Sequence, residues 1–437
     1  MSGSPVVGWK CAVCGAEVGI AQPFSWHCPR ATEVDRHHAP QLVQQPVQEL
    51  APLRSSGDAN PFVAFRRYLA WDAFAAAAGM SDASREALVV ELDTTVAAVA
   101  GTGFVTTPFA RAHALSDELG FTADGGVWVK DETANVAGSH KARHLFGILL
   151  HLVTAERSGI ATWSSPADRP PLAIASCGNA ALAAATLAAA VHWPLRVFVP
   201  PSANRHVTNR LVELGAVVVE CPRRADDPPG DPCVHCFREA VAAGAVPFSV
   251  QGTENAWCLD GGRTIGWEMA QQTEHDDGPP FDRLFVQVGG GAFAASVAAG
   301  FRTSGVTPRL HAVQTHACAP LSRAWDLAPS VGGPRHVAEH WSDVMWPWEH
   351  VGASAADGIL DDETYDWLPV MSAMADGHGE PVVVDEAQVL AANEIGCRTT
   401  GIDASHTGTA GLAGLLALGE HVARDERVAL VFSGVRR

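Results

Sequence analysis

The stretch Gly138-Ser139-His140-Lys141 separates two segments of opposite character. Before it comes the run Val127-Trp128-Val129-Lys130-Asp131-Glu132, and after it the apolar segment Leu145-Phe146-Gly147-Ile148-Leu149-Leu150. This order predicts a strand, a loop and then a helix that begins near Lys141, with the lysine side chain facing inward. Burial disfavours the charged amine and lowers its pKa, which prepares a lysine to attack a carbonyl and form a Schiff base. A lone lysine at a helix start is more often solvated, so this interpretation depends on the motifs elsewhere in the chain.

The segments downstream alternate between short apolar strands and helices. Strands are expected at 172–175, 196–199 and 216–220, with helices at 180–191 and 205–214. A second set of strands is expected at 248–251, 284–288, 310–314 and 428–432. Such alternation specifies parallel sheets with helices on both faces. The predicted fold class is therefore α/β, with two doubly wound domains and a small cysteine-containing segment at the N-terminus.

A glycine-rich turn stands where the second sheet is expected to bind a ligand. Gly289, Gly290, Gly291 and Ala292 follow the predicted strand 284–288 and open an Ala-rich helix. Glycines let backbone N–H groups converge on a phosphate at the positive end of a helix. Tight connections between strands and helices also need glycine, but ligands of such sheets bind at the carboxyl ends of the strands. The turn is therefore a candidate phosphate cradle.

Four motifs together resemble a known enzyme family. Lys130-Asp131-Glu132 with Gly138-Ser139-His140-Lys141, then Ser176-Cys177-Gly178-Asn179, then Gly289-Gly290-Gly291-Ala292, then Ser433-Gly434 occur in this order. The series resembles the pyridoxal-phosphate enzymes grouped with tryptophan synthase β, threonine synthase, cysteine synthase and serine/threonine dehydratase (fold type II). The resemblance covers roughly residues 60 to 437, and it implies a tryptophan synthase β-like fold with pyridoxal 5'-phosphate in a cleft between the two domains.

The resemblance also implies roles around the cofactor. Lys141 would hold the cofactor aldehyde and act on the substrate α-proton, and His140 would lie nearby. Asn179, which could otherwise be a helix N-cap, would donate to the phenolic oxygen. Ser433 would meet the pyridine nitrogen, and a neutral hydroxyl there makes the ring a weaker electron sink than a carboxylate would.

The loop before Asn179 is expected to bind the substrate. In the similar enzymes its backbone N–H groups and a hydroxyl receive the substrate carboxylate, which assigns Ser176, Cys177 and Gly178 to that role. Cys177 has no histidine base in the local sequence, which favours a small pocket residue over a nucleophile.

The N-terminal segment 1–55 carries a candidate zinc knuckle. Cys11 and Cys14 form a C-x-x-C pair and Cys28 is a third candidate ligand, because two thiols at this spacing can clasp one zinc ion. For the fourth ligand His37 is the choice, with His38 as the local alternative and the distant pair Cys233/Cys236 as another. Free thiols without metal remain the competing interpretation, since Cys28 lacks the second partner that a zinc ribbon would have.

The expected domain boundaries follow from the motifs. Residues 40–61, rich in Gln, Pro and Ser, are expected to form a linker or an arm on the surface. After the segment 1–55, residues 56–140 and 225–437 are expected to form the larger α/β domain. Residues 141–224 are expected to form the smaller one. Region 319–366, rich in Trp, Pro and Asp, has no assigned role.

Composition restricts the partners. The formal net charge is −18 over 437 residues, which argues against nucleic acid and anionic membranes as partners. The apolar stretches are interrupted before a membrane span is complete, and the ten cysteines read as reduced thiols. A cytoplasmic protein with a small-molecule amino-acid substrate is expected, and the relatives imply a homodimer.

The predicted function is elimination with ammonia release from a β-hydroxy or related β-substituted amino acid, as in threonine/serine dehydratases. One alternative is threonine synthase acting on O-phosphohomoserine, for which Arg143, Arg205 and Arg210 are candidate phosphate contacts. A β-replacement synthase and a catalytically silent relative that binds pyridoxal phosphate are further alternatives.

Overall fold

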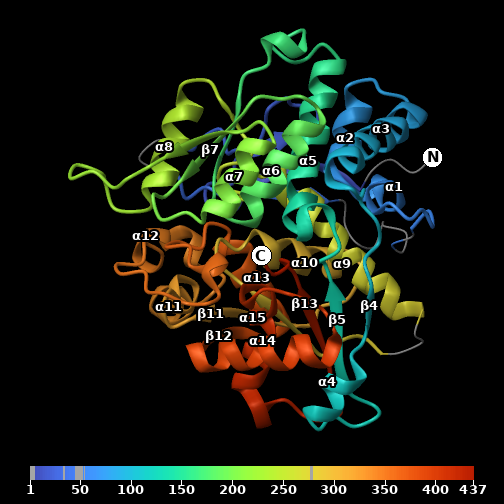
Figure 1. Cartoon of the computed structure of the whole chain (residues 1–437), viewed down its shortest axis with the longest axis vertical. Helices are drawn as coiled ribbons and strands as arrows, with labels where there is room; N and C mark the ends of the chain where they lie inside the picture. Colours follow the sequence, from blue (N-terminus) through green and yellow to red (C-terminus); the bar gives the residue numbers. More distant parts are fainter. Residues whose placement is uncertain (1–4, 33–34, 45–52, 54, 276–278) are drawn as a thin grey trace. The chain divides into compact units, whose positions relative to one another are not determined.

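The structure is a computed structural model that describes residues 5–32, 35–44, 53, 55–275 and 279–437 (Figure 1). The chain divides into two compact units. Unit 1 comprises Met1–Val105, Asn135–Ala137 and Lys141–Thr264, and unit 2 comprises Thr106–Ala134, Gly138–His140 and Ile265–Arg437. Parts of the predicted linker, residues 45–52 and 54, lie outside the described residues.

Unit 1 contains a four-stranded parallel sheet in the order β8-β7-β6-β9. Its strands are β6 (Leu172–Ala175), β7 (Leu195–Val199), β8 (Val217–Glu220) and β9 (Val246–Pro247). The strands predicted from the apolar runs at 172–175, 196–199 and 216–220 are confirmed to within one residue. Strand β6 reads Leu-Ala-Ile-Ala, the continuous apolar run that a parallel strand needs when helices cover both faces.

The helices of unit 1 begin and end at recognisable signals. They are α1 (Pro61–Ala64), α2 (Ala70–Ala77), α3 (Asp82–Ala100), α5 (Lys141–Arg157), α6 (Asn179–Ala190), α7 (Arg205–Glu213), α8 (Pro232–Ala242) and the start of α9 (Cys258–His275), with short 3₁₀ turns η2 (Arg66–Tyr68), η3 (Val136–Gly138) and η4 (Pro166–Asp168). Ser81 caps α3 by accepting from the Ser84 N–H, and Gly101 ends it with φ of 79°. The Ala-rich α6 contacts both α5 and α7 (Figure 1).

The boundaries of the units differ from the predicted domains. Residues 61–100 were expected with the larger domain, yet α2 packs on α5 and α3 on α6. The predicted strand 248–251 was expected in the second sheet. Instead β9 ends at Pro247 and pairs with β6, because the β8-α8-β9 crossover returns the chain to the sheet it left. The Phe248 N–H still donates to the Ala173 carbonyl at 2.8 Å.

A three-stranded antiparallel sheet lies at the start of unit 1. Its strands are β1 (Val6–Cys11), β2 (Glu17–Gly19) and β3 (Pro40–Gln44), in the order β2-β1-β3. The register pairs Cys11 with Pro40. The turn between β1 and β2 contains Gly15 with φ of 69°, a conformation that glycine adopts without a steric penalty.

Unit 2 contains a six-stranded sheet in the order β12-β11-β10-β13-β5-β4. Its strands are β4 (Phe109–Arg111), β5 (Gly126–Asp131), β10 (Arg283–Gln287), β11 (Arg309–Thr315), β12 (Glu380–Val384) and β13 (Arg427–Phe432). All neighbours are parallel except the edge strand β4, which is antiparallel to β5. Two parallel sheets with crossover helices confirm the predicted α/β class.

Helices cover this sheet and close its core. They are α4 (His113–Glu118), α10 (Ala292–Thr303), α11 (Pro320–Leu327), α12 (Trp341–Val344), α13 (Trp367–Gly377), α14 (Glu386–Thr400) and α15 (His406–Leu418), with 3₁₀ turns η5 (Ala328–Val331), η6 (Val337–His340), η7 (Asp357–Ile359) and η8 (Gly419–His421). Gly414 lets α15 approach the sheet, since a Cβ there would collide with Val313. The region 319–366, for which no role was predicted, forms short helices joined by loops.

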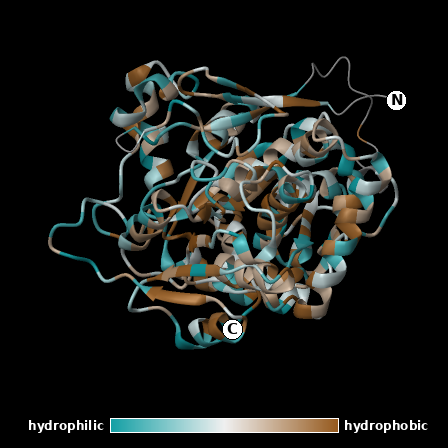
Figure 2. Cartoon of the chain, turned by 90° about the horizontal axis from the view of Figure 1, so that it is seen from above, coloured by the Kyte–Doolittle hydropathy of each residue, from teal (hydrophilic) through white to brown (hydrophobic). Residues whose placement is uncertain are grey.

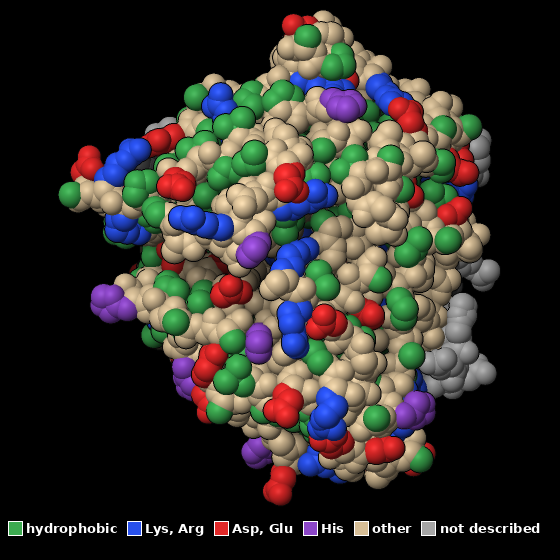
Figure 3. Space-filling model, in the orientation of Figure 1, with side chains coloured by type: hydrophobic (Ala, Val, Ile, Leu, Met, Phe, Trp, Pro, Cys, Tyr) green, Lys and Arg blue, Asp and Glu red, His purple; other side chains and the backbone are tan. Residues whose placement is uncertain are grey.

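The distribution of polarity agrees with these layers. Hydrophobic residues gather on the strands, whereas hydrophilic ones gather on loops and outward helix faces (Figure 2). On the face drawn in Figure 3, acidic and basic side chains are interspersed. Among the helices that the structure describes, none combines the length and the apolarity needed to cross a bilayer.

Candidate active site and cysteine cluster

Lys141 is the first residue of α5, as predicted. The helix that it opens is buried from Ala142 to Ala155, so the apolar run fixes the position of the lysine backbone. Lys141 itself is half-buried, which makes it less enclosed than the predicted inward-facing side chain. The lowered pKa of its amine stays a prediction.

The chain has three lysines, and their surroundings differ sharply. Lys10 is exposed and pairs with Glu17 at 3.1 Å. Lys130 on β5 is fully buried, and its ammonium donates to the Thr107 carbonyl at 2.6 Å, to Glu268 at 2.5 Å and to Gln272 at 2.9 Å. These three bonds use every N–H of that ammonium. Lys141 is neither fully exposed, as Lys10 is, nor fully buried, as Lys130 is.

Two histidines on α5 are held neutral. Burial, followed by the nearby positive charge of Lys141, lowers the pKa of His144 to about 3. Burial also lowers the pKa of His151 to about 4. The His151 ring stacks on Trp257 with centroids 4.3 Å apart. The lowered pKa values of both histidines follow mainly from the cost of placing a charge in an apolar interior.

His140 connects three of the predicted motifs within unit 2. Its backbone N–H donates to the Ser433 hydroxyl oxygen at 3.1 Å, and its Nδ1 lies 2.5 Å from the same oxygen. Its ring stacks on Phe293, one residue beyond the glycine turn, with centroids 3.8 Å apart. Phe293 was not predicted as a site residue, because only its position next to the turn was visible in the sequence.

The loop before His140 also packs on the C-terminal segment. Gly138 has φ of 71°, and a Cβ there would lie 2.6 Å from Val435 Cγ1. The Val435 N–H donates to the Gly138 carbonyl at 3.0 Å. A glycine is therefore required at 138 by both backbone conformation and close approach.

The turn Gly289–Gly291 connects β10 and α10. Gly291 is the N-cap of α10 with φ of 94°, and among the described residues no side chain caps this helix. The N–H groups at the start of a helix and the helix dipole suit an anion. The segment 361–366, which sequence reasoning missed, packs on this turn: the Asp366 N–H donates to the Gly290 carbonyl at 2.7 Å, and a Cβ at Gly289 would collide with the Asp361 carboxylate.

These features fit pyridoxal phosphate in unit 2. The glycine turn supplies a cradle that side chains would fill, and the hydroxyl of the buried Ser433 is of the donor type that a pyridine nitrogen accepts. Asp361 is the exception, because a carboxylate beside the turn opposes a second anion.

The predicted substrate loop lies in unit 1. Ser176 follows β6, and its backbone N–H donates to the Phe198 carbonyl at 3.2 Å. Gly178 is the N-cap of α6, where no side chain of the described residues caps the helix. Asn179 is the first residue inside α6, so a simple N-cap role for its side chain is excluded. Cys177 is exposed.

The structure thus brings together Gly138–His140, the glycine turn and Ser433 in unit 2. Lys141 and Ser176–Asn179 belong to unit 1. Lys141 is nevertheless peptide-bonded to His140, which keeps its Cα about 3.8 Å from that of His140.

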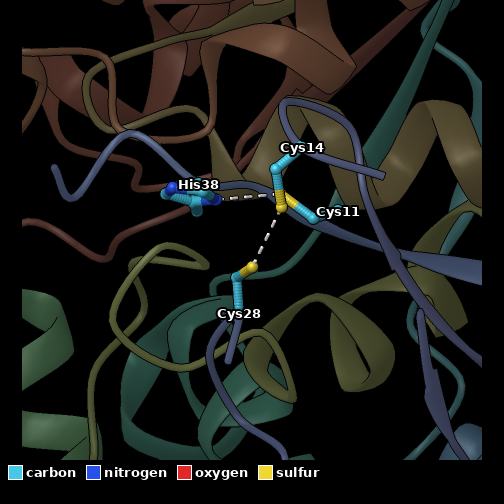
Figure 4. A group of neighbouring side chains, drawn as sticks. All are labelled: Cys11, Cys14, Cys28 and His38. Carbon is cyan, nitrogen blue, oxygen red and sulfur yellow. Dashed lines mark hydrogen bonds between the residues drawn. The ribbon is translucent and has the colours of Figure 1, made fainter. Parts of the chain in front are cut away.

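A second cluster gathers the N-terminal cysteines (Figure 4). Cys11, Cys14, Cys28 and His38 place their ligand atoms within 4.8 Å of one another. The expected fourth ligand His37 is corrected to His38, because alternate residues of an extended segment face opposite sides and the Cys11–Pro40 pairing turns His38 toward Cys11. Such a set of thiols and imidazole could bind a metal such as zinc.

The distant pair considered as an alternative lies apart from this cluster. Cys233 and Cys236 belong to α8 and pack with Cys221 in a core that contains Phe198 and Phe237. Burial raises the pKa of Cys221 to about 12, which keeps this thiol protonated and unreactive.

Comparison with known proteins agrees with the motif order. The sequence model of the family described as pyridoxal-phosphate dependent enzyme matches residues 101–434. The threonine synthase of Methanosarcina acetivorans is 25% identical over 338 residues, which cover 75% of this chain and 74% of that protein.

Solved structures share the fold at lower identity. The processed form of threonine deaminase isoform 2 from Solanum lycopersicum superposes with a TM-score of 0.58 at 18% identity, covering 89% of this chain and 95% of that one. Diaminopropionate ammonia lyase from Escherichia coli gives a TM-score of 0.60 at 15% identity, covering 80% of this chain and 88% of that one.

Proposed function

Because the chain belongs to the pyridoxal-phosphate dependent enzymes, we propose that it eliminates the β-substituent of a β-hydroxy or related β-substituted amino acid, after which hydrolysis of the product releases ammonia and a 2-oxo acid. The cofactor would be held by Lys141, with its phosphate on the turn Gly289–Ala292. When bound, this group withdraws electrons from the substrate α-carbon. The position of His140 carries the proposal, because one residue contacts Ser433 and Phe293 and is bonded to Lys141.

The contact with His140 decides where the Ser433 hydroxyl can donate. The Ser433 oxygen already accepts from the His140 backbone N–H, and a hydroxyl has a single proton to donate. If Ser433 donates that proton to a pyridine nitrogen, the Nδ1 of His140 must carry its own proton and donate to Ser433. A neutral hydroxyl here does not force the ring to stay protonated, which favours expulsion of a leaving group over prolonged carbanion chemistry.

Lys141 would serve as the base. The Nζ of Lys141 would hold the cofactor in the absence of substrate and would remove the α-proton when substrate is bound. Lys10 and Lys130 are unsuited, since the first is exposed with Glu17 and the second uses all its donors. The N-terminus of α6, behind Ser176–Gly178, would receive the substrate carboxylate through backbone N–H groups.

Two of the three candidate phosphate contacts already bind other groups, which favours elimination over a γ-phosphate substrate. Arg143 is fully buried and donates to Thr264 at 3.1 Å. Arg205 and Arg210 are exposed on α7, where Arg210 pairs with Glu213 at 3.0 Å. Threonine synthase is the second candidate, since the sequence is similar to that enzyme from Methanosarcina acetivorans.

The test is a substrate panel on purified protein reconstituted with pyridoxal phosphate. Hydroxy, sulfur, amino and phospho amino acids are assayed for ammonia, oxo acid and inorganic phosphate. Ammonia and oxo acid from a β-substituted substrate support the proposal. Phosphate from O-phosphohomoserine selects threonine synthase, and an absorbance band that no amino acid shifts contradicts both.

Borohydride reduction followed by peptide mapping tests the amine. The label should appear on the peptide that contains Lys141, and K141A should lose both label and visible band. K10A is the matched control, because it removes an exposed lysine in unit 1. Label on Lys130 or Lys10 would overturn the assignment.

A further inference from the structure

We propose that Cys11, Cys14, Cys28 and His38 hold one structural zinc ion, a site separate from the proposed active site. Figure 4 shows the three thiols and the imidazole turned toward a common centre. Three cysteines and one histidine form one of the ligand sets of structural zinc. Magnesium and calcium need oxygen ligands, and none of the four side chains supplies one.

Two distances between ligand atoms are close to those around a tetrahedral ion. With Zn–S bonds of about 2.3 Å and a Zn–N bond of about 2.0 Å, neighbouring ligand atoms lie roughly 3.5 to 3.8 Å apart. The sulfurs of Cys14 and Cys28 are 3.5 Å apart, and Cys11 Sγ lies 3.4 Å from His38 Nδ1. A disulfide needs about 2.05 Å, so Cys14 and Cys28 are free thiols.

The surroundings of the cluster orient its ligands. Asp35 Oδ2 lies 3.3 Å from His38 Nε2. A proton on Nε2 would be held by this carboxylate, which leaves Nδ1 as the nitrogen that faces the thiols and can bind metal. The backbone N–H of Arg30 donates to Cys28 Sγ at 3.4 Å, a contact that stabilises a thiolate.

Arg30 also places a positive charge near the cluster, which would offset the negative charge of a zinc–thiolate site. Three thiolates and a neutral imidazole around Zn²⁺ leave a net charge of −1, and the Arg30 guanidinium donates to the Cys14 carbonyl at 3.3 Å. The competing interpretation is a core of protonated thiols. Under that interpretation the Cys11 thiol would donate to Nδ1 of His38, which is only 4% exposed, and the metal content of the protein distinguishes the two interpretations.

The four protein ligands leave no open coordination position, so the ion would be structural. It would join β1, the Cys28 loop and the residues before β3, which the short strands alone hold weakly. Trp26, two residues before Cys28, accepts from the Ala256 N–H through its carbonyl at 2.7 Å and packs edge-on against Trp257 at 5.5 Å. Trp257 in turn stacks on His151 of α5. The ion would therefore stabilise unit 1 from its N-terminal sheet.

The test measures metal by mass spectrometry on the full-length protein, expressed with zinc and dialysed against metal-free buffer. About one zinc per chain is expected. The adjacent histidines give a matched pair: H38A should lower the zinc content at least tenfold, and H37A should leave it unchanged. C14S should behave as H38A, and C397S, at a half-buried cysteine outside the cluster, should behave as wild type.

A second measurement uses the wild-type protein, so that the test does not depend on whether the ligand variants fold. Cobalt(II) exchanged into the wild-type protein should give the intense visible and near-ultraviolet bands of tetrahedral thiolate coordination, with equal intensity in H37A. Zinc below about 0.1 per chain in the wild type, iron or copper in its place, or equal zinc in H38A and H37A would overturn the proposal. None of these readouts depends on pyridoxal phosphate.

Discussion

Strand β5 and helix α5 each carry a lysine, and the two residues have opposite surroundings. On β5, Lys130 is sealed in the interior and every N–H of its ammonium is bonded. On α5, Lys141 stands at the helix start, next to His140 and its bond with Ser433. Burial alone therefore does not make a lysine reactive. A fully paired ammonium keeps its charge for the fold, and reactivity needs an amine that can exchange partners.

The largest effect is expected when the amine of Lys141 is removed. The variant K141A should lose its visible cofactor band and at least about 10³-fold in activity, because both the covalent amine and the base disappear. Its free energy of unfolding without cofactor should change little, since Lys141 is half-buried at a helix end. Absorbance, turnover and urea titration check this. A full cofactor band in K141A would refute the assignment.

A loss of stability is expected when the carboxylate that pairs with Lys130 is removed. The variant E268A leaves a buried ammonium without its carboxylate, which should reduce the free energy of unfolding by about 3 to 5 kcal/mol. The double variant K130M/E268L should recover part of that loss. E17A, which removes the exposed partner of Lys10, should cost under about 1 kcal/mol. Urea denaturation of the four proteins decides, and equal costs for E268A and E17A would contradict the pairing.

The free energy of unfolding should depend on pH through the buried His151 of α5. The pKa of His151 is about 4 in the folded chain, against a usual value of 6.5. The unfolded chain therefore binds more protons between these values, so the stability is complete above pH 6.5 and is lost as the pH falls toward 4. From pH 7 to pH 5 the loss due to His151 should be about 2 kcal/mol.

The variant H151F is the control for this titration. It keeps an aromatic ring against Trp257 and removes the titrating group, so its free energy of unfolding should fall less between pH 7 and pH 5. Urea titrations at both pH values measure the difference. An identical fall in wild type and H151F would show that other groups account for the acid sensitivity.

The fourth prediction concerns Ser433. The variant S433A removes the oxygen that accepts from the His140 N–H, and cofactor affinity and kcat/KM should each fall about tenfold, near 1.4 kcal/mol. S304A, at the C-cap of α10, removes a hydroxyl that donates to the Gly300 carbonyl at 3.1 Å and should leave both unchanged. Unaltered affinity and kcat/KM in S433A would place the cofactor elsewhere.

The smallest effect is expected at Asp361. Because its carboxylate borders the glycine turn, D361N should tighten the binding of pyridoxal phosphate two- to threefold, about 0.5 kcal/mol, by removing a like charge. D326N, at an exposed residue of α11, should have no effect. Titration of cofactor absorbance measures both, and weaker binding in D361N would mean that Asp361 supports the turn and does not oppose its anion.

Local features were predictable from the sequence because they depend on neighbouring residues. The apolar run 172–175 and the glycines at 289–291 determine a strand and a turn through backbone preferences that act over a few residues. The same holds for Lys141 at the start of α5. The family resemblance placed these elements in order before any contact was known.

Features that depend on distant contacts were not predictable. The choice of His38 over His37 follows from the pairing of β1 with β3, and β9 joins the sheet of β6 although its sequence would suit either sheet. The stacking of Phe293 on His140 joins residues that are far apart in the chain, and the role of 361–366 depends on where its loop ends. In each case tertiary packing decided among local alternatives.

The strands at the sheet edges described above carry one further consequence. Among the described strands, β9 and β12 include Pro247 and Pro381, and the edge strand β4 is three residues long. A proline cannot donate to a neighbouring strand, and a very short strand offers few backbone groups for pairing. These three edges give another chain little on which to extend a sheet, whereas β8, the other edge of the four-stranded sheet, has neither a proline nor a three-residue length.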